Sequence, residues 1–180
     1  MLGALRQEII FARHQKETGR PPRWLGIPLI VTSHAWENGK NEQSHQDPTI
    51  GEALLGEMSD MARIFFPADA NSALEALRHI YADRGVIGCI VTPKRAVANL
   101  LSWAQVQEAL HRGAVTISAP ANPVIQFAAL GAYQVREARR AQARLASKGV
   151  SVQITAIVEP GRLREPRDAH EALFVLSDRE

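Results

Sequence analysis

The chain has 180 residues, of which 46% are hydrophobic and 22% are charged. This length and composition fit one globular domain, or parts of two, with a core of ordinary size. The 21 basic and 19 acidic residues nearly cancel, which leaves a formal charge of +2 and argues against a nucleic-acid partner. Because we find neither a signal peptide nor an apolar stretch long enough for a membrane span, we expect no membrane partner and a cytoplasmic location.

The first half of the chain alternates helical and strand patterns. Apolar residues at helical spacing predict a helix from Leu2 to about Gln15, which Gly19 and the Pro21–Pro22 pair would end. Strands are predicted at 27–33, 62–67 and 86–93, a helix after Pro48, and another helix at 69–85. The strands are continuous apolar runs, which indicates burial on both faces. We therefore predict an α/β fold with an open, mostly parallel sheet and helices on both faces.

The pattern changes near residue 96. A connector with a short helix at about 103–112 leads to a turn-like stretch at 118–123, where we place a domain boundary. A second α/β unit follows, with a strand in "VIQFAAL", a long helix closed by Gly149, a strand in "VSVQITAIVEP" and a further helix starting in "REPRDAHEALF". Since two strands cannot protect both edges of a sheet, we expect this unit to be incomplete and the chain to self-associate as a homo-oligomer. We interpret the basic cluster at 135–144 as a solvated helix face rather than a patch for an anionic partner.

Hydrogen-bonding side chains crowd the stretch "TSHAWENGKNEQSHQDPTIGEAL", residues 32–54. It follows the strand "IPLIV" and leads into a helix, the position where parallel sheets bind ligands and where helix N-termini attract anions. The donors that could hold a phosphate or a polyhydroxylated sugar are Asn38, Lys40, Asn41, Gln43, His45 and Gln46. We interpret Asp47 as a helix cap and not as a catalytic acid. The sequence gives no nucleophilic triad and no metal-ligand spacing in this stretch.

A second candidate is "IVTPKRAV", residues 90–97, which also follows a strand. Parallel strands present their carboxyl ends on one edge, so Lys94 or Arg95 could reach the side of the sheet that carries residues 38–46. The alternative is that both are solvated basic residues. We interpret Asp69 or Asn71 as the cap of the following helix, and the single cysteine, Cys89, as a buried core residue.

Three motifs in register carry a family resemblance. "SHAWENGKNEQSHQDP", "FPADANSALEAL" and "VTPKRAV" resemble the pyrimidine-binding domain of the phosphoketolases, which are relatives of transketolase. The resemblance is strong over about residues 25–100, and residues 122–180 are more loosely similar to the start of the family's carboxy-terminal domain. It implies the latter part of a pyrimidine-binding domain at 1–95, a linker at 96–121, and the start of a transketolase-like C-terminal domain at 122–180.

The resemblance also implies an activity. Phosphoketolases use thiamine diphosphate and Mg2+ to cleave xylulose 5-phosphate or fructose 6-phosphate with inorganic phosphate, which yields acetyl phosphate and an aldose phosphate. His45 falls on the active-site histidine of the family, Asn41 on an asparagine near the phosphate, and Lys94 on a lysine that binds phosphate. Asn38 takes the place of a glutamine and Lys40 that of a histidine, while Gln46 matches. The sequence does not choose between the two sugars.

The cofactor motifs of the family are absent from this sequence. It has no Gly-Asp-Gly motif followed by an Asn pair, and Glu8 does not match the glutamate that activates the cofactor. We therefore expect a fragment of a phosphoketolase that is inactive and binds no cofactor by itself. The alternatives are one component of a split transketolase-like enzyme, or a non-catalytic module for oligomerisation or anion binding.

Overall fold

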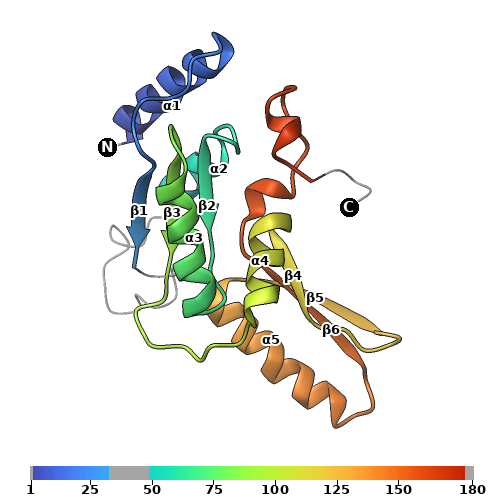
Figure 1. The fold of residues 1–180 in the computed structure, drawn as a ribbon. Coiled ribbons are helices and arrows are strands. Elements are labelled where there is room, and N and C mark those ends of the chain that lie inside the picture. The colour runs from blue at the N-terminus through green and yellow to red at the C-terminus, as the bar shows by residue number, and fades with distance from the viewer. Residues whose placement is uncertain (1, 33–48, 177–180) are drawn as a thin grey trace.

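A computed structural model describes residues 2–32 and 49–176 of the chain. Within these ranges the strands form two three-stranded sheets, joined by helix α4 and the segments on either side of it (Figure 1). The α/β class and the mostly parallel sheet predicted from the sequence are confirmed. No helix in the described ranges has the length and apolarity needed to cross a membrane.

The first sheet is entirely parallel, with the order β1-β3-β2. Its strands are β1 Ile27–Val31, β2 Ala62–Phe65 and β3 Ile87–Val91, and its helices are α1 Leu2–Glu17, α2 Thr49–Leu55 and α3 Ala70–Ala82. Side chains alternate across β3: Ile87 and Cys89 join the core cluster that contains α1 and α2, whereas Ile90 joins the cluster that contains α3 and α4. The central strand is therefore covered on both faces, which is why its sequence is continuously apolar.

Gly88 sets how closely α3 lies on this sheet. A Cβ atom at Gly88 would stand 2.2 Å from the Ile80 side chain. Because side chains alternate across a strand, Gly88 shares a face with Ile90, and its missing side chain lets the helix approach β3.

The second sheet is mixed. Its order is β4-β6-β5, with β4 Ala114–Ser118 antiparallel to β6 Val152–Ile157, and β5 Ile125–Leu130 parallel to β6. Helix α5, Gly131–Ala146, connects β5 to β6. The sequence predicted β5, α5 and β6 but missed β4, so the expectation of only two strands was wrong. The helix predicted at 103–112 is confirmed as α4, Trp103–Arg112.

The sequence pattern did not predict β4, because this strand begins directly after α4. Gly113 adopts a left-handed conformation with a φ of 79°, which ends the helix and turns the chain into the strand within one residue. The domain boundaries remain a prediction, but β4 lies inside the stretch that we expected to be a linker.

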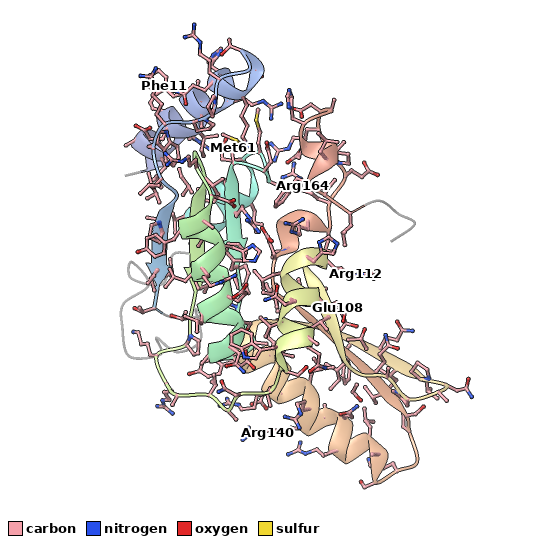
Figure 2. All side chains as sticks on the ribbon, viewed as in Figure 1. Phe11, Met61, Glu108, Arg112, Arg140 and Arg164 are labelled. Carbon is pink, nitrogen blue, oxygen red and sulfur yellow. The ribbon has the colours of Figure 1, made fainter. Side chains whose placement is uncertain are left out.

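The predicted helix in "REPRDAHEALF" is also wrong. The described C-terminal segment contains only the short 3-10 turns η3 Pro160–Arg162 and η4 Glu171–Leu173. Its side chains are engaged elsewhere: Arg164, labelled in Figure 2, donates to the carbonyls of Leu55 and Glu57, and buried Glu171 accepts from the Ser59 backbone N–H. These contacts tie the segment across the end of α2, where open carbonyls need donors.

An ion-pair cluster around buried Arg63 and Glu159 joins the two sheets; with Asp83 and Arg162 we call these residues the joint cluster. Arg63 of β2 donates to both carboxylate oxygens of Glu159, at 2.6 and 2.9 Å, and to Asp83 at 3.0 Å. Arg162 donates to Glu159 at 3.0 Å, and both guanidinium groups lie against the Phe174 ring. Burial alone would lower the pKa of Arg63, but hydrogen bonds and charge from Glu159 hold it above its ordinary value. A buried charge with such partners fixes the geometry of the parts that it joins.

Candidate functional site at the carboxyl edge of the first sheet

Both polar motifs leave the first sheet at adjacent strand ends. β1 and β3 are neighbours, Val31 pairs with Val91 in the register, and the Thr92 N–H donates to the Val31 carbonyl at 2.9 Å. The chain after β1 leads into the polar stretch 32–54, and the chain after β3 leads to Lys94 and Arg95. The two stretches therefore start side by side at the carboxyl edge of a parallel sheet, the usual position for ligands in this class of fold.

Most of the predicted site residues lie outside the described residues, because these exclude 33–48. This applies to Asn38, Lys40, Asn41, His45 and Gln46. Lys94 is described: it lies three positions after Val91, in an exposed segment that links β3 to α4. The assignment of these residues to one site remains a prediction.

Asp69 fixes the far end of the segment that carries Lys94. Its carboxylate caps α3 by accepting from the Ser72 N–H at 2.9 Å, which confirms the predicted cap. The second oxygen accepts from the backbone N–H groups of Leu100 and Leu101, both at 2.8 Å. Burial opposes the charge, but the N–H donors of Leu101, Ser72 and Leu100 hold the pKa of Asp69 below its ordinary value.

The sequence patterns did not reveal this second role of Asp69. The cap is a local pattern, since Ser72 follows three residues after Asp69 in a reciprocal capping arrangement. The Leu100 and Leu101 backbone groups lie about thirty positions away in the sequence, and they carry no side-chain signal for the contact. As a result, the segment between β3 and α4 is held at both ends, by the sheet at Val91 and by Asp69 at Leu100.

The described residues offer no metal site. Within 2–32 and 49–176, no group of three His, Cys, Asp or Glu side chains could hold a metal ion. The predicted burial of Cys89 is confirmed, and burial raises the pKa of its thiol to about 11, so it is unsuited to act as a nucleophile near neutral pH.

The fold of this chain is similar to that of solved transketolase structures. The structure is similar to that of a transketolase variant of Pichia stipitis crystallised with xylulose 5-phosphate, with a TM-score of 0.61 and 18% identity over 83% of this chain and 21% of that chain. It is also similar to a protein described as a split gene transketolase, inactive beta4 tetramer, with a TM-score of 0.51 and 18% identity over 72% of this chain and 38% of that chain. The chain therefore has a transketolase-like fold.

Proteins of related sequence give a more specific relationship than the fold does. Residues 1–83 match the family model of the D-xylulose 5-phosphate/D-fructose 6-phosphate phosphoketolases. A protein of Streptomyces avermitilis named "Probable phosphoketolase" is 28% identical over 165 residues, which is 86% of this chain and 21% of that protein. The chain is related to the phosphoketolase family. It spans about a fifth of the length of the curated relatives that it matches most extensively.

Proposed function

We propose that this chain contributes the sugar-phosphate side of a phosphoketolase active site. In the complete enzyme the reaction is the cleavage of xylulose 5-phosphate or fructose 6-phosphate with inorganic phosphate, and thiamine diphosphate with Mg2+ supplies the carbanion chemistry. The observation that carries the proposal is the pairing of Val31 with Val91 in parallel register. That pairing makes the polar stretch and the Lys94 segment start at neighbouring strand ends, in a chain related to the phosphoketolases.

Each residue has a role within this proposal. Lys94 would act as a point charge for a phosphate group, since the ammonium group is a compact donor that binds phosphate without a fixed plane. Asn41 would donate a neutral hydrogen bond to the same phosphate, while Asn38, Lys40 and Gln46 would contact the sugar or phosphate oxygens. His45 would transfer the proton that accompanies the loss of water from the two-carbon unit, because its unperturbed pKa lies near neutral pH.

Binding to the purified chain tests the site itself. Fructose 6-phosphate or inorganic phosphate, titrated while backbone NMR shifts are followed, should perturb the resonances of the segment between β3 and α4. Lys94→Ala should weaken this binding about tenfold, because it removes one charged hydrogen bond. Lys148→Ala, two positions after the end of α5, is the matched control and should leave the affinity unchanged. Equal binding by wild type and Lys94→Ala would refute the assignment of Lys94.

A separate assay tests the catalytic part. With fructose 6-phosphate, phosphate, thiamine diphosphate and Mg2+, the chain alone should form no acetyl phosphate. Formation of acetyl phosphate above the rate of a protein-free mixture would show that the expectation of inactivity is wrong.

A second candidate is one component of a split enzyme. The similarity to a split gene transketolase supports it, because that protein covers 72% of this chain with the same fold. Under this proposal a separate polypeptide with the Gly-Asp-Gly motif would restore acetyl phosphate formation when mixed with this chain.

A non-catalytic module would instead bind phosphate or self-associate, and no such polypeptide would restore activity. Each sheet has two outer strands, β1 and β2 in the first and β4 and β5 in the second, so a homo-oligomer remains our prediction, which light scattering coupled to size exclusion would check. A cytoplasmic location also remains a prediction.

A further inference from the structure

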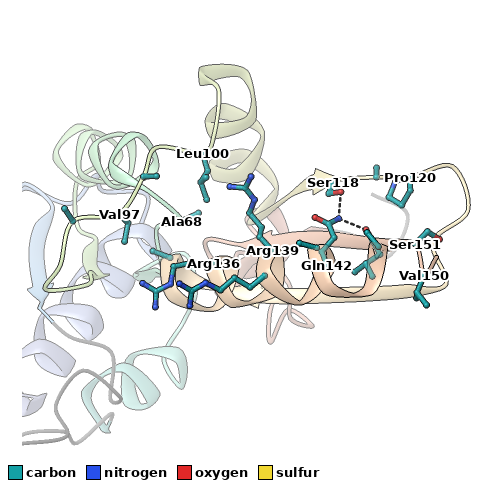
Figure 3. A pocket seen from close by; sticks show the side chains of 18 residues that line it. Ala68, Val97, Leu100, Ser118, Pro120, Arg136, Arg139, Gln142, Val150 and Ser151 are labelled. Atoms are coloured by element: carbon teal, nitrogen blue, oxygen red, sulfur yellow. Dashed lines mark hydrogen bonds between the residues drawn. The ribbon is translucent and has the colours of Figure 1, made fainter. Parts of the chain in front are cut away.

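A groove of about 990 Å³ runs along α5, between that helix, the segment 96–100 and the ends of β4 and β6 (Figure 3). It is separate from the proposed sugar-phosphate site and contains none of the residues assigned to it. Alanines of α5 and the side chains of Val97, Leu100, Pro120 and Val152 form its apolar surface. Its volume is at the upper end of the range for small-molecule sites.

The walls of the groove are fixed by hydrogen bonds. On one side, the Leu100 N–H donates to buried Asp69 at 2.8 Å. On the other, the Gln142 side-chain amide donates to the Ser118 hydroxyl at 2.6 Å and to the Val152 carbonyl at 2.8 Å. The groove is therefore held open by specific contacts on both sides, as expected of a largely pre-formed site.

Three arginines give the groove a strong positive charge. Arg136, Arg139 and Arg140 line it, and none of its described lining residues is acidic. Positions three and four apart share one face of a helix, where like charges repel each other. Glu137 pairs with Arg136 at 3.1 Å and with Arg140 at 2.9 Å, and Arg136 also lies over the Tyr133 ring.

Arg139 has no acidic partner among the described residues. In Figure 3 its side chain extends from α5 toward the segment that carries Leu100. From the sequence we expected these arginines to be solvated, and they are exposed. The structure adds that the same side chains border an apolar groove, which the one-dimensional charge pattern does not reveal.

We propose that this groove binds an organic anion in which a carboxylate or phosphate head is attached to an aliphatic body. Guanidinium groups bind such heads through paired hydrogen bonds, and the single nearby carboxylate leaves positive charge to be neutralised. The lining favours an aliphatic body over a ring system, because its apolar side chains are Ala, Val, Leu and Pro and it lacks any aromatic residue to stack on. An inorganic anion alone would leave this apolar surface in water.

Calorimetric titration of the full chain with octanoate, octyl glucoside and inorganic phosphate separates the contribution of the anionic head from that of the aliphatic chain. Octanoate carries both the charge and the aliphatic chain, octyl glucoside carries the chain with a neutral head, and phosphate carries only the charge. We expect saturable binding of octanoate, with octyl glucoside and phosphate each at least tenfold weaker. Equal affinity for octanoate and octyl glucoside, no binding of octanoate, or phosphate binding as tight as octanoate that Arg139→Gln/Arg140→Gln weakens, would overturn the proposal.

Matched variants locate the binding in the groove. The double variant Arg139→Gln/Arg140→Gln should weaken octanoate binding at least tenfold, because it removes two of the three charged donors. Arg144→Gln is the control, since it removes the same type of charge from α5 at a position that does not line the groove. Ala143→Phe, which fills the groove, should abolish binding while circular dichroism shows an unchanged fold. A control variant as damaging as the double variant, or full binding by Ala143→Phe, would refute the site.

Discussion

Two groups of arginine and glutamate side chains in this molecule have different surroundings. In the joint cluster, Arg63 and Glu159 are 4% and 0% exposed and hold two sheets together through paired hydrogen bonds. On the surface of α5, Arg136, Glu137 and Arg140 form pairs at similar distances, but each side chain is about half exposed or more. Arginine and glutamate therefore form buried pairs that join the sheets and exposed pairs on the surface of α5.

The difference follows from solvation. A buried charge has lost its water, so removing its partner leaves an uncompensated charge, whereas an exposed pair is replaced by water at little cost. The buried charges of the joint cluster, Arg63 and Glu159, therefore stabilise the fold. The exposed charges on α5 are available to a ligand, which is the basis for proposing a function for them. Substitutions of Arg63 and Glu137 test this contrast, and a substitution of Asp69, a buried carboxylate held by backbone N–H groups, adds a case between them.

The largest effect is expected from Arg63→Ala. It removes the two hydrogen bonds to Glu159 and leaves that buried carboxylate with Arg162 as its remaining described donor. The free energy of unfolding should fall by about 3–5 kcal/mol, the usual cost of breaking a buried pair. Urea unfolding followed by circular dichroism measures it. A loss below about 1 kcal/mol would mean that the joint cluster is no stronger than a surface pair.

An intermediate effect is expected from Asp69→Asn. The Asn side chain keeps one acceptor oxygen and its NH2 group cannot accept, so the variant loses either the bond from the Ser72 N–H or the bonds from the Leu100 and Leu101 N–H groups. Leaving buried donors unsatisfied should lower the free energy of unfolding by about 1–3 kcal/mol. Asn71→Ala is the comparison, because Asn71 contacts the same segment only through one bond to the Leu101 carbonyl. An equal loss in both variants would argue against Asp69 as the principal anchor.

The pH dependence of the Asp69 contribution has a defined sign. Its pKa is lowered in the folded state, so its stabilisation is fully present above the unfolded pKa of about 3.9. The stabilisation is lost as the pH falls through the lower, folded pKa. The difference in unfolding free energy between wild type and Asp69→Asn should therefore be constant from neutral pH to about pH 5 and shrink below about pH 4. A difference that grows on acidification would contradict this assignment.

The smallest effect is expected from Glu137→Gln. It breaks both surface pairs on α5, yet its partners remain in water, so the thermal unfolding midpoint should not shift beyond experimental error. Scanning calorimetry at low and high salt provides the check. A clear, salt-dependent loss of stability would mean that the α5 surface is a structural network and would weaken the case for a ligand there.

Sequence patterns predicted the fold well where the signal is local. The continuous apolar runs around Ile64 and Cys89 predicted buried parallel strands, and the position of Asp69 or Asn71 before a helix predicted a cap, which the structure assigns to Asp69. β4 was missed because Gly113 alone separates it from a helix, and the helix predicted near Glu171 was wrong because tertiary contacts engage that segment. The candidate site was predicted from motifs, and of its residues the structure describes only Lys94.

By itself the sequence determined the order of most helices and strands, the burial of Cys89, the relation to the phosphoketolases and the order of the site motifs. Only the tertiary structure decided that β1 and β3 are neighbours, that Arg63 reaches Glu159 across 96 positions, and that α5 borders a groove with the 96–100 segment. The physical reason is the distance in the sequence between the residues that interact. Hydrophobic periodicity and capping depend on residues within a few positions of each other, whereas these contacts arise when packing brings distant segments together.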